Sequence, residues 1–328
     1  MPKNNSIKRA VSLYSFQEEY FLRKLSLEDL LAVSERLDIP GIEIIGDQMI
    51  PGYPKVPDAF FDQWHSWMEK YHHTPVCLDM FLEWNKFKGR TMTEEEKVAS
   101  VVEDIKFAKR LGCTIVRMIH MLTPDFMERL APYAEKYEIK LGLEIHAPFH
   151  FDTEYEQALI EKYQKVGSKY LGFVLDLGIY TKRFPRIISD RWVRNGMKPE
   201  IAKYIVDAYD NHKMDTIDKD VAQLGGTQDD IDAAALAKYN VYSDPNRMLD
   251  YMQYIFHVHG KFTEMLPDYT DYSIPYAQII PVLIKGGFSG YIASEYEGNW
   301  YLQDIGAVDS VEQVRRHQVM LKHLLGEE

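Results

Sequence analysis

Short apolar runs that alternate with stretches of helical periodicity constrain the fold of this chain most strongly. Eight strand-like runs are each followed by a segment whose apolar residues recur at helical spacing. This alternation predicts a parallel sheet with right-handed crossovers, and eight units predict a closed TIM barrel. An open doubly wound sheet is the competing architecture, but no GxGxxG sequence follows the first run. The runs cover Arg9–Phe16, Gly41–Ile45, Pro75–Phe81, Thr114–His120, Lys140–His146, Leu171–Leu177, Tyr254–Phe262 and Gly290–Tyr296.

Helix-start signals lie between several of these runs. Ser26-Leu-Glu-Asp, Thr93-Glu-Glu-Glu and Ser310-Val-Glu-Gln each place a hydroxyl residue three positions before an acidic or amide residue. With 328 residues, of which 46% are hydrophobic, the chain can bury the core of one elaborated barrel. We therefore expect a single domain over residues 1–328.

The regularity breaks after the sixth run, between Tyr180 and about Asn246. This segment is far longer than one crossover helix requires, and it contains a cationic stretch and two helical stretches. Because it leaves from the carboxyl end of a strand, where barrel active sites are built, we expect a lid or a subunit contact within residues 180–246.

Composition narrows the class of protein. The net charge of −12 comes from acidic residues spread among basic ones, which argues against nucleic acid or an anionic membrane as a partner. Cys77 and Cys113 both lie in apolar runs and are expected to be buried, unpaired thiols of a reducing compartment. No apolar run approaches ~20 residues. These features predict a cytoplasmic protein without a membrane segment.

Polar residues occur at the carboxyl ends of four predicted strands. Residues two apart on a strand share a face, so alternate polar residues here point into the barrel mouth. Any one of them alone has an ordinary alternative role, as a charge satisfied at a strand end. Grouping so many carboxylates around one cavity would be costly without a cation among them. The residues are Glu144 and His146, Asp176, His257, His259 and Lys261, and Glu295 and Glu297.

A divalent metal is the simplest such cation. Carboxylate oxygens together with imidazole suit Mn²⁺, Mg²⁺, Co²⁺ or Zn²⁺, and a site rich in carboxylates favours the harder ions. We expect Mn²⁺. Further polar residues near strand ends, including His120 and Glu43, have a substrate-binding or a hydrogen-bonded structural role as alternatives.

The order of these residues resembles the xylose isomerase-like family of sugar isomerases and epimerases over nearly the whole chain. The resemblance implies that a divalent cation, usually Mn²⁺, is held by Glu144, Asp176, His259 and Glu295. The second histidine of the HxH pair is generally the family's ligand, which favours His259 over His257. The histidine that follows the Asp in multi-metal members is absent, because this chain reads DLGIY.

Within that family, LEIHAPFHF, FHVHGKF, SEYEGNW and the long insertion resemble the alpha subunit of bacterial C-glycoside deglycosidases. The resemblance implies a lyase that cleaves the carbon–carbon bond of a 3-oxo-C-glucoside and works with a smaller beta subunit. The alternatives are an isomerase or epimerase of a free sugar, and a barrel that has lost catalysis and serves as a scaffold.

The chemistry assigns roles to the remaining residues. A ketone at C3 acidifies the C2 proton, so a positioned base can remove it while a metal stabilises the enediolate. His146 is the acid–base candidate, because it shares the face of Glu144 and titrates near neutrality. Lys261 and Glu297 are candidates for charge stabilisation or relay, and His257 and His120 for substrate binding.

Overall fold

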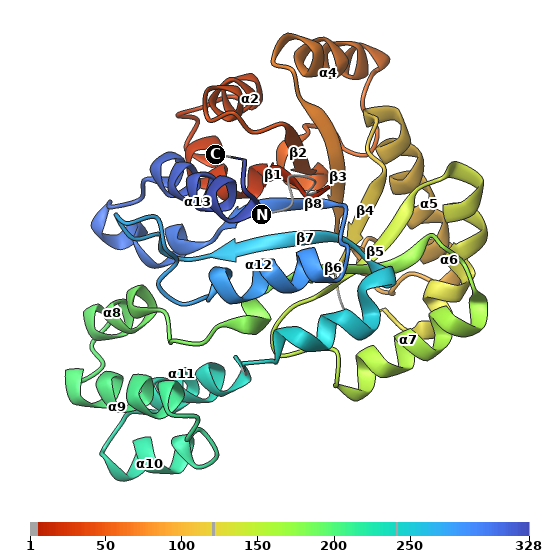
Figure 1. Ribbon diagram of the computed structural model, residues 1–328. Helices are drawn as coiled ribbons and strands as arrows, with labels where there is room; N and C mark the ends of the chain where they lie inside the picture. The colour runs from red at the N-terminus through yellow and green to blue at the C-terminus, as the bar shows by residue number, and fades with distance from the viewer. Residues whose placement is uncertain (1–5, 120–121, 241, 328) are drawn as a thin grey trace.

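Over residues 6–119, 122–240 and 242–327, which the computed structural model describes, eight parallel strands close into one barrel with helices outside it (Figure 1). The strands pair in chain order, and β8 returns to pair with β1, so the predicted TIM barrel is confirmed. The strands are β1 (Lys8–Ser12), β2 (Gly41–Ile45), β3 (Thr74–Met80), β4 (Ile115–Met118), β5 (Lys140–Ile145), β6 (Leu171–Asp176), β7 (Ile255–Phe262) and β8 (Tyr291–Tyr296).

The strands are buried along almost their whole length, because the outer helices cover one face and the barrel interior fills the other. Three strands, β2, β7 and β8, end where the sequence predicted, and the other five end one to four residues earlier. The first run continues beyond β1 as a 3-10 helix, η1 (Leu13–Phe16), and His146 lies just past β5. These residues leave the sheet at the barrel mouth.

Four of the outer helices begin where a local side chain accepts a hydrogen bond from a free backbone N–H group. Ser26 and Thr93 form the predicted capping boxes of α2 and α5. The predicted cap at Ser310 is wrong by one residue, because Asp309 caps α13 and Ser310 is already helical. The helices that pack around the barrel are α1 (Gln17–Phe21), α2 (Leu27–Arg36), α3 (Gly46–Met49), α4 (Asp58–Lys70), α5 (Glu94–Leu111), α6 (Pro124–Tyr137), α7 (Glu154–Val166), α12 (Tyr276–Lys285) and α13 (Ser310–Leu325).

Four helices form the segment that follows β6, and they stand to one side of the barrel (Figure 1). Their apolar residues make a small core of their own around Ile201, Ile205 and Val221. On the barrel side, Arg194 forms an ion pair with Asp304, at 2.7 Å. The helices are α8 (Arg186–Arg194), α9 (Pro199–Asp210), α10 (Ile217–Gln223) and α11 (Gln228–Tyr239), and the 3-10 helices η2 (Leu177–Tyr180) and η3 (Pro245–Tyr254) flank them.

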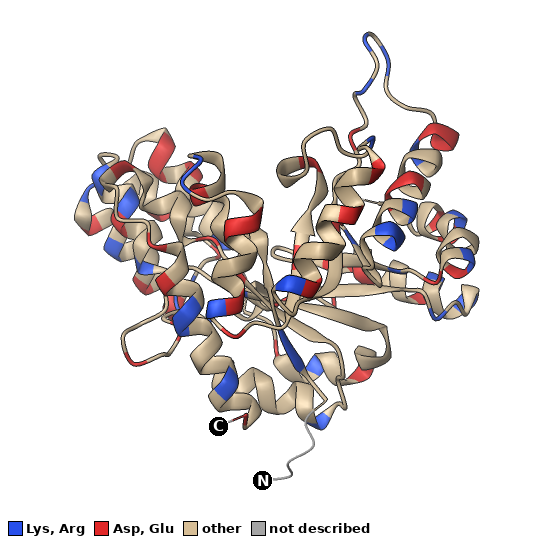
Figure 2. Ribbon diagram, turned by 90° about the horizontal axis from the view of Figure 1, so that it is seen from above, with Lys and Arg blue, Asp and Glu red and all other residues tan. Residues whose placement is uncertain are grey.

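The charge pattern and the cysteines follow the sequence expectations. Acidic and basic residues are interspersed over the outer helices (Figure 2). Cys77 and Cys113 are buried and unpaired. Among the described residues, no helix combines the length and apolar character needed to cross a membrane.

Candidate metal centre and active site

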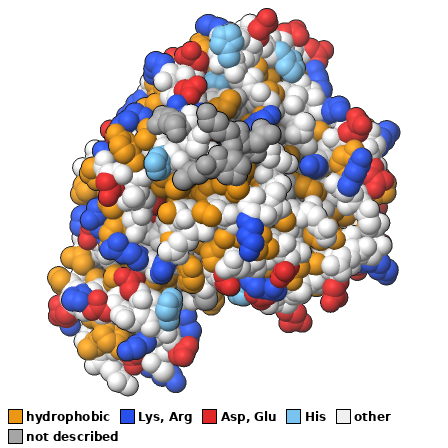
Figure 3. Space-filling model, viewed as in Figure 1, with side chains coloured by type: hydrophobic (Ala, Val, Ile, Leu, Met, Phe, Trp, Pro, Cys, Tyr) orange, Lys and Arg blue, Asp and Glu red, His pale blue; other side chains and the backbone are white. Residues whose placement is uncertain are grey.

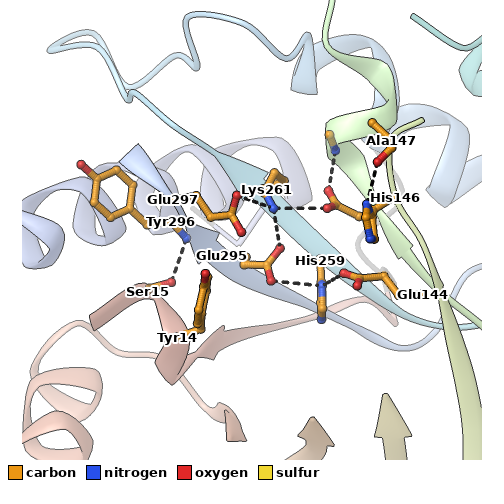
Figure 4. Close-up of polar contacts among 12 residues, drawn as sticks. Tyr14, Ser15, Glu144, His146, Ala147, His259, Lys261, Glu295, Tyr296 and Glu297 are labelled. Carbon is orange, nitrogen blue, oxygen red and sulfur yellow. Dashed lines mark hydrogen bonds and ion pairs between the residues drawn. The ribbon is translucent and has the colours of Figure 1, made fainter. Parts of the chain in front are cut away.

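Side chains from β5, β7 and β8 converge just inside the carboxyl end of the barrel (Figure 4). At its centre, His259 Nδ1 lies 2.7 Å from Glu144 Oε1 and 3.3 Å from Glu295 Oε1. One ligand atom from each of these three residues lies within 4.8 Å of the other two. The resemblance implied these three residues together with Asp176, which lies outside this cluster. The three come from the inward faces of different strands of one closed sheet.

The donor set fits a divalent cation. Glu144, His259 and Glu295 are almost fully buried, and Glu295 Oε2 has no hydrogen-bond partner. Two carboxylates and an imidazole are ligands that Mn²⁺, Zn²⁺ and related ions accept. Lys261 Nζ, 3.5 Å from Glu295 Oε2, offsets its charge but leaves it without a hydrogen bond, so the oxygen is available as a metal ligand.

Charge compensation without a metal comes from neighbouring cations. Burial alone would lower the pKa of His259, but Glu295, Glu43 and Glu144 raise it well above its ordinary value. Burial opposes ionisation of Glu144 as well, yet Arg117 and His259 hold the pKa of that carboxyl well below its usual range. The carboxyl groups of Glu144 and Glu295 are therefore ionised at neutral pH, which is the form that binds a metal, whereas His259 is protonated and would lose its Nδ1 proton to act as a ligand.

Asp176 lines the same cavity as Glu144 and Glu295, but the cation beside it is Lys261. Its Oδ1 accepts a 2.6 Å hydrogen bond from the backbone N–H of Gly178, and its Oδ2 lies 3.4 Å from Lys261 Nζ. Lys261 Nζ also lies 3.5 Å from Glu295 and 2.8 Å from Glu297 (Figure 4). Lys261 thus joins three carboxylates, one of which belongs to the His259 cluster.

His146 lies beside this cluster, half-buried at the mouth. Its Nδ1 lies 2.7 Å from the carbonyl oxygen of Ala147, so a neutral ring donates from Nδ1 and its Nε2 is the basic nitrogen. Two adjoining cavities, of about 290 and about 240 Å³, share His146, Asp176, Lys261 and Glu297 in their walls. The candidate acid–base and charge-relay residues therefore face the same space.

The walls of these cavities suit a substrate with an apolar part. Tyr14 and Phe81 line the first cavity, and Tyr301 lines the second. Pro185, which precedes α8, and Ile188 of α8 complete the second cavity. The insertion thus contributes to the walls of the candidate active site.

Arg117 on β4 is a site residue that sequence reasoning missed. Its guanidinium lies 2.7 Å from Glu144 Oε2, and it lines the larger cavity. A cation in the buried run TIVRM was the available signal. The site residue predicted from the run Thr114–His120 is its last, His120, whereas Arg117 lies three positions earlier, within β4.

The two predicted substrate-binding histidines have different outcomes. His257 is completely buried, its Nε2 lies 2.6 Å from Glu43 Oε2, and it lines neither cavity. A substrate in these cavities has no access to it, so this placement argues against a binding role. His120 lies outside the described residues.

Comparisons with known proteins identify relatives along the whole chain. The model of the xylose isomerase-like TIM-barrel family matches residues 31–321. The 3'-dehydrocarminate deglycosidase alpha subunit of Microbacterium sp. is 31% identical, over 97% of this chain and 95% of its own. A C-glycoside deglycosidase alpha subunit of Arthrobacter globiformis is 30% identical, over 89% of this chain and 85% of its own.

Solved structures share the fold at lower identity. The zinc-bound crystal structure of the IOLI protein is 17% identical, with a TM-score of 0.59 over 98% of this chain and 99% of that one. The structure of L-ribulose 3-epimerase is 12% identical, with a TM-score of 0.59 over 98% of this chain and 95% of that one. These two likenesses support the barrel fold.

Proposed function

The chain belongs to the xylose isomerase-like TIM-barrel family, and on that premise we propose that it is a metal-dependent carbon–carbon lyase of 3-oxo-C-glycosides. One observation carries the proposal. His146 shares a cavity with a buried carboxylate–histidine cluster, in a chain about 30% identical to deglycosidase alpha subunits over most of its length.

Glu144, His259 and Glu295 would hold the metal, with Asp176 as the fourth ligand and Mn²⁺ as the ion. The bound ion supplies Lewis-acid stabilisation of the negative charge that develops on the sugar oxygens. Arg117 holds Glu144 through its Oε2, which leaves Oε1 directed at His259 and the centre of the cluster.

His146 would act as the base at C2 of the sugar. Its Nε2 takes the C2 proton, and the electron pair left on C2 forms the C1=C2 double bond. The bond between C1 and the aglycone carbon breaks with its electrons on the aglycone, which takes up one proton. The ammonium of Lys261, placed between Asp176 and Glu297, would offset charge on the sugar oxygens.

The aromatic cavity wall favours elimination over simple epimerisation. Epimerisation of a free ketose uses the same proton abstraction, but it ends with return of the proton and needs only a small polar pocket. Here Tyr14, Phe81 and Tyr301 border the two joined cavities, which suits an aromatic aglycone attached to the sugar.

We also propose that the chain works in the cytoplasm with a smaller beta subunit. The names of the relatives as alpha subunits support a partner, and the buried free thiols suit a reducing compartment. Helix α11 and the turn that precedes it expose large apolar side chains, with Leu236 and Tyr239 of α11 67% and 58% exposed. The lobe that carries them projects at the lower left of Figure 3, with hydrophobic side chains among charged ones.

The activity is tested with Mn²⁺-loaded protein and a 3-oxo-C-glucoside, with and without a candidate beta subunit. We expect release of the free aglycone, followed by chromatography, at a rate that the beta subunit raises. Exchange of the C2 hydrogen of a ketose with solvent deuterium, without aglycone release from any glycoside, would instead identify an epimerase.

The metal assignment is tested with Glu144→Gln and Glu295→Gln. Each variant should stay folded, lose activity and bind less Mn²⁺, measured by metal analysis after dialysis. Glu156→Gln is a matched control, because this buried carboxyl on α7 lies outside the cluster and lines neither cavity. Full metal content in both cluster variants would refute the ligand assignment.

The partner assignment is tested with Leu236→Asp on the insertion. It should weaken complex formation in size-exclusion chromatography with light scattering, while the chain itself stays folded. Ile284→Asp, at a 41% exposed position on α12 of the barrel wall, should leave the complex intact. Equal complex formation by both variants would exclude this face of α11.

A further inference from the structure

Glu43 lies on the far side of His259 from the proposed metal ligands. The two ring nitrogens of His259 face different carboxylates. Nδ1 faces Glu144 and Glu295, whereas Nε2 lies 3.2 Å from Glu43 Oε1. Glu43 belongs to β2, so it reaches His259 across the interior of the barrel.

Glu43 has no access to substrate. It is completely buried, and it is absent from the walls of both cavities. Its other oxygen, Oε2, lies 2.6 Å from Nε2 of His257, which is equally buried. The His257 contact anchors the carboxylate from below and fixes which oxygen points at His259.

Two buried atoms between Glu43 and His259 are incompletely satisfied. Glu43 Oε1 and His259 Nε2 lie within ion-pair distance, yet neither has a hydrogen bond of good geometry. Leaving such atoms unpaired in the barrel interior is unfavourable. An N–H on Nε2 that donates to Oε1 would satisfy both atoms. At Nδ1 a proton donates to Glu144 Oε1, and a metal held by Glu144 and Glu295 would take the place of that proton.

We propose that Glu43 is a positioning residue that keeps the proton of His259 on Nε2, so that Nδ1 is the metal-ligating atom. The inference rests on the metal site proposed above. A carboxylate behind a ligating imidazole fixes the tautomer and the ring orientation and increases the basicity of the ligand. His257 holds Glu43 in place and has no direct contact with the metal.

The test compares wild type, Glu43→Gln and Glu156→Gln after removal of metal. Titration calorimetry with Mn²⁺ should give an affinity about 10- to 100-fold weaker for Glu43→Gln and unchanged for Glu156→Gln. Long-range proton–nitrogen NMR of ¹⁵N-histidine protein loaded with Zn²⁺ should show His259 metallated at Nδ1 and protonated at Nε2.

Several outcomes would overturn the proposal. Metallation of His259 at Nε2 in the wild type would do so even if Glu43→Gln failed to fold. Unchanged Mn²⁺ affinity in Glu43→Gln would refute the positioning role of Glu43 but not the metal site. A wild type that binds no metal would refute the metal site as well. Two cations per wild-type chain, and one in Glu43→Gln, would make Glu43 a ligand of the cluster that it forms with His257 and His259.

Discussion

Replacing His146 with alanine separates acid–base chemistry from metal binding. His146 lines both cavities but does not belong to the Glu144, His259 and Glu295 cluster. We therefore expect His146→Ala to keep its Mn²⁺ and its fold and to lose turnover. The fold should survive because the ring is only half-buried and follows β5 instead of packing inside the barrel.

The size of the loss follows from the role. Removing a positioned acid–base group costs a factor of about 10² to 10⁴, or about 3–5 kcal/mol of transition-state stabilisation. The contact between Nδ1 and the Ala147 carbonyl fixes the ring. Because the base acts only in the transition state, its loss should lower kcat and kcat/KM together. The assay is aglycone release under saturating substrate, beside metal analysis of the same sample.

A neighbouring histidine provides the control. His150 lies four positions further along the chain and lines neither cavity, so His150→Ala should retain full turnover. Loss of the metal from His146→Ala would make His146 a ligand and place the base elsewhere. Turnover within threefold of wild type, which is less than ~1 kcal/mol, would refute the acid–base role.

Two further predictions concern buried charge. Lys261→Met leaves three carboxylates without their shared cation, so the unfolding free energy of the metal-free protein should fall by about 3–5 kcal/mol. Saturating Mn²⁺ should reduce that deficit in calorimetry, and an equal deficit with and without metal would contradict this reasoning. Burial raises the pKa of Glu156 to about 8, against about 4.3 in the unfolded chain. Its stabilising contribution is therefore present at acid pH and lost as the pH rises through 8. Glu156→Gln should gain stability over wild type between about pH 5 and about pH 8 in urea unfolding, whereas a pH-independent difference would contradict the shift.

The barrel was predictable because each strand is specified locally. The run Gly41–Ile45 has the same bounds in the sequence and in the structure, since glycine and the preceding proline mark its start. Strand ends at the mouth were less predictable. Leu13–Phe16 has the apolar character of a strand but turns into η1, where the Ser15 hydroxyl donates to the Ser294 carbonyl and accepts from the Tyr296 N–H of β8.

The site was predictable in part, and the limits have a physical cause. Glu144, His259 and Glu295 end different strands, so barrel closure alone brings them together. The partners of these residues depend instead on the relative height of the strands around the barrel, both neighbouring strands (β4 and β5) and strands that face each other across it (β2 and β7). Arg117 meets Glu144 and Glu43 meets His259 only because of the register of the closed sheet, which a single sequence does not encode in any local pattern.

The three inward-facing polar residues of β7 lie at three different depths in the barrel. His257 contacts Glu43 deep in the barrel, His259 reaches the metal cluster above it, and Lys261 pairs with Glu297 at the mouth. Spacing by two places them on one face, one above the other. Their depths decide what each residue can contact, because the cavity at the barrel mouth reaches Lys261 but not His257. One strand would thus supply a structural anchor, the proposed metal ligand and the proposed substrate-facing cation, in sequence order.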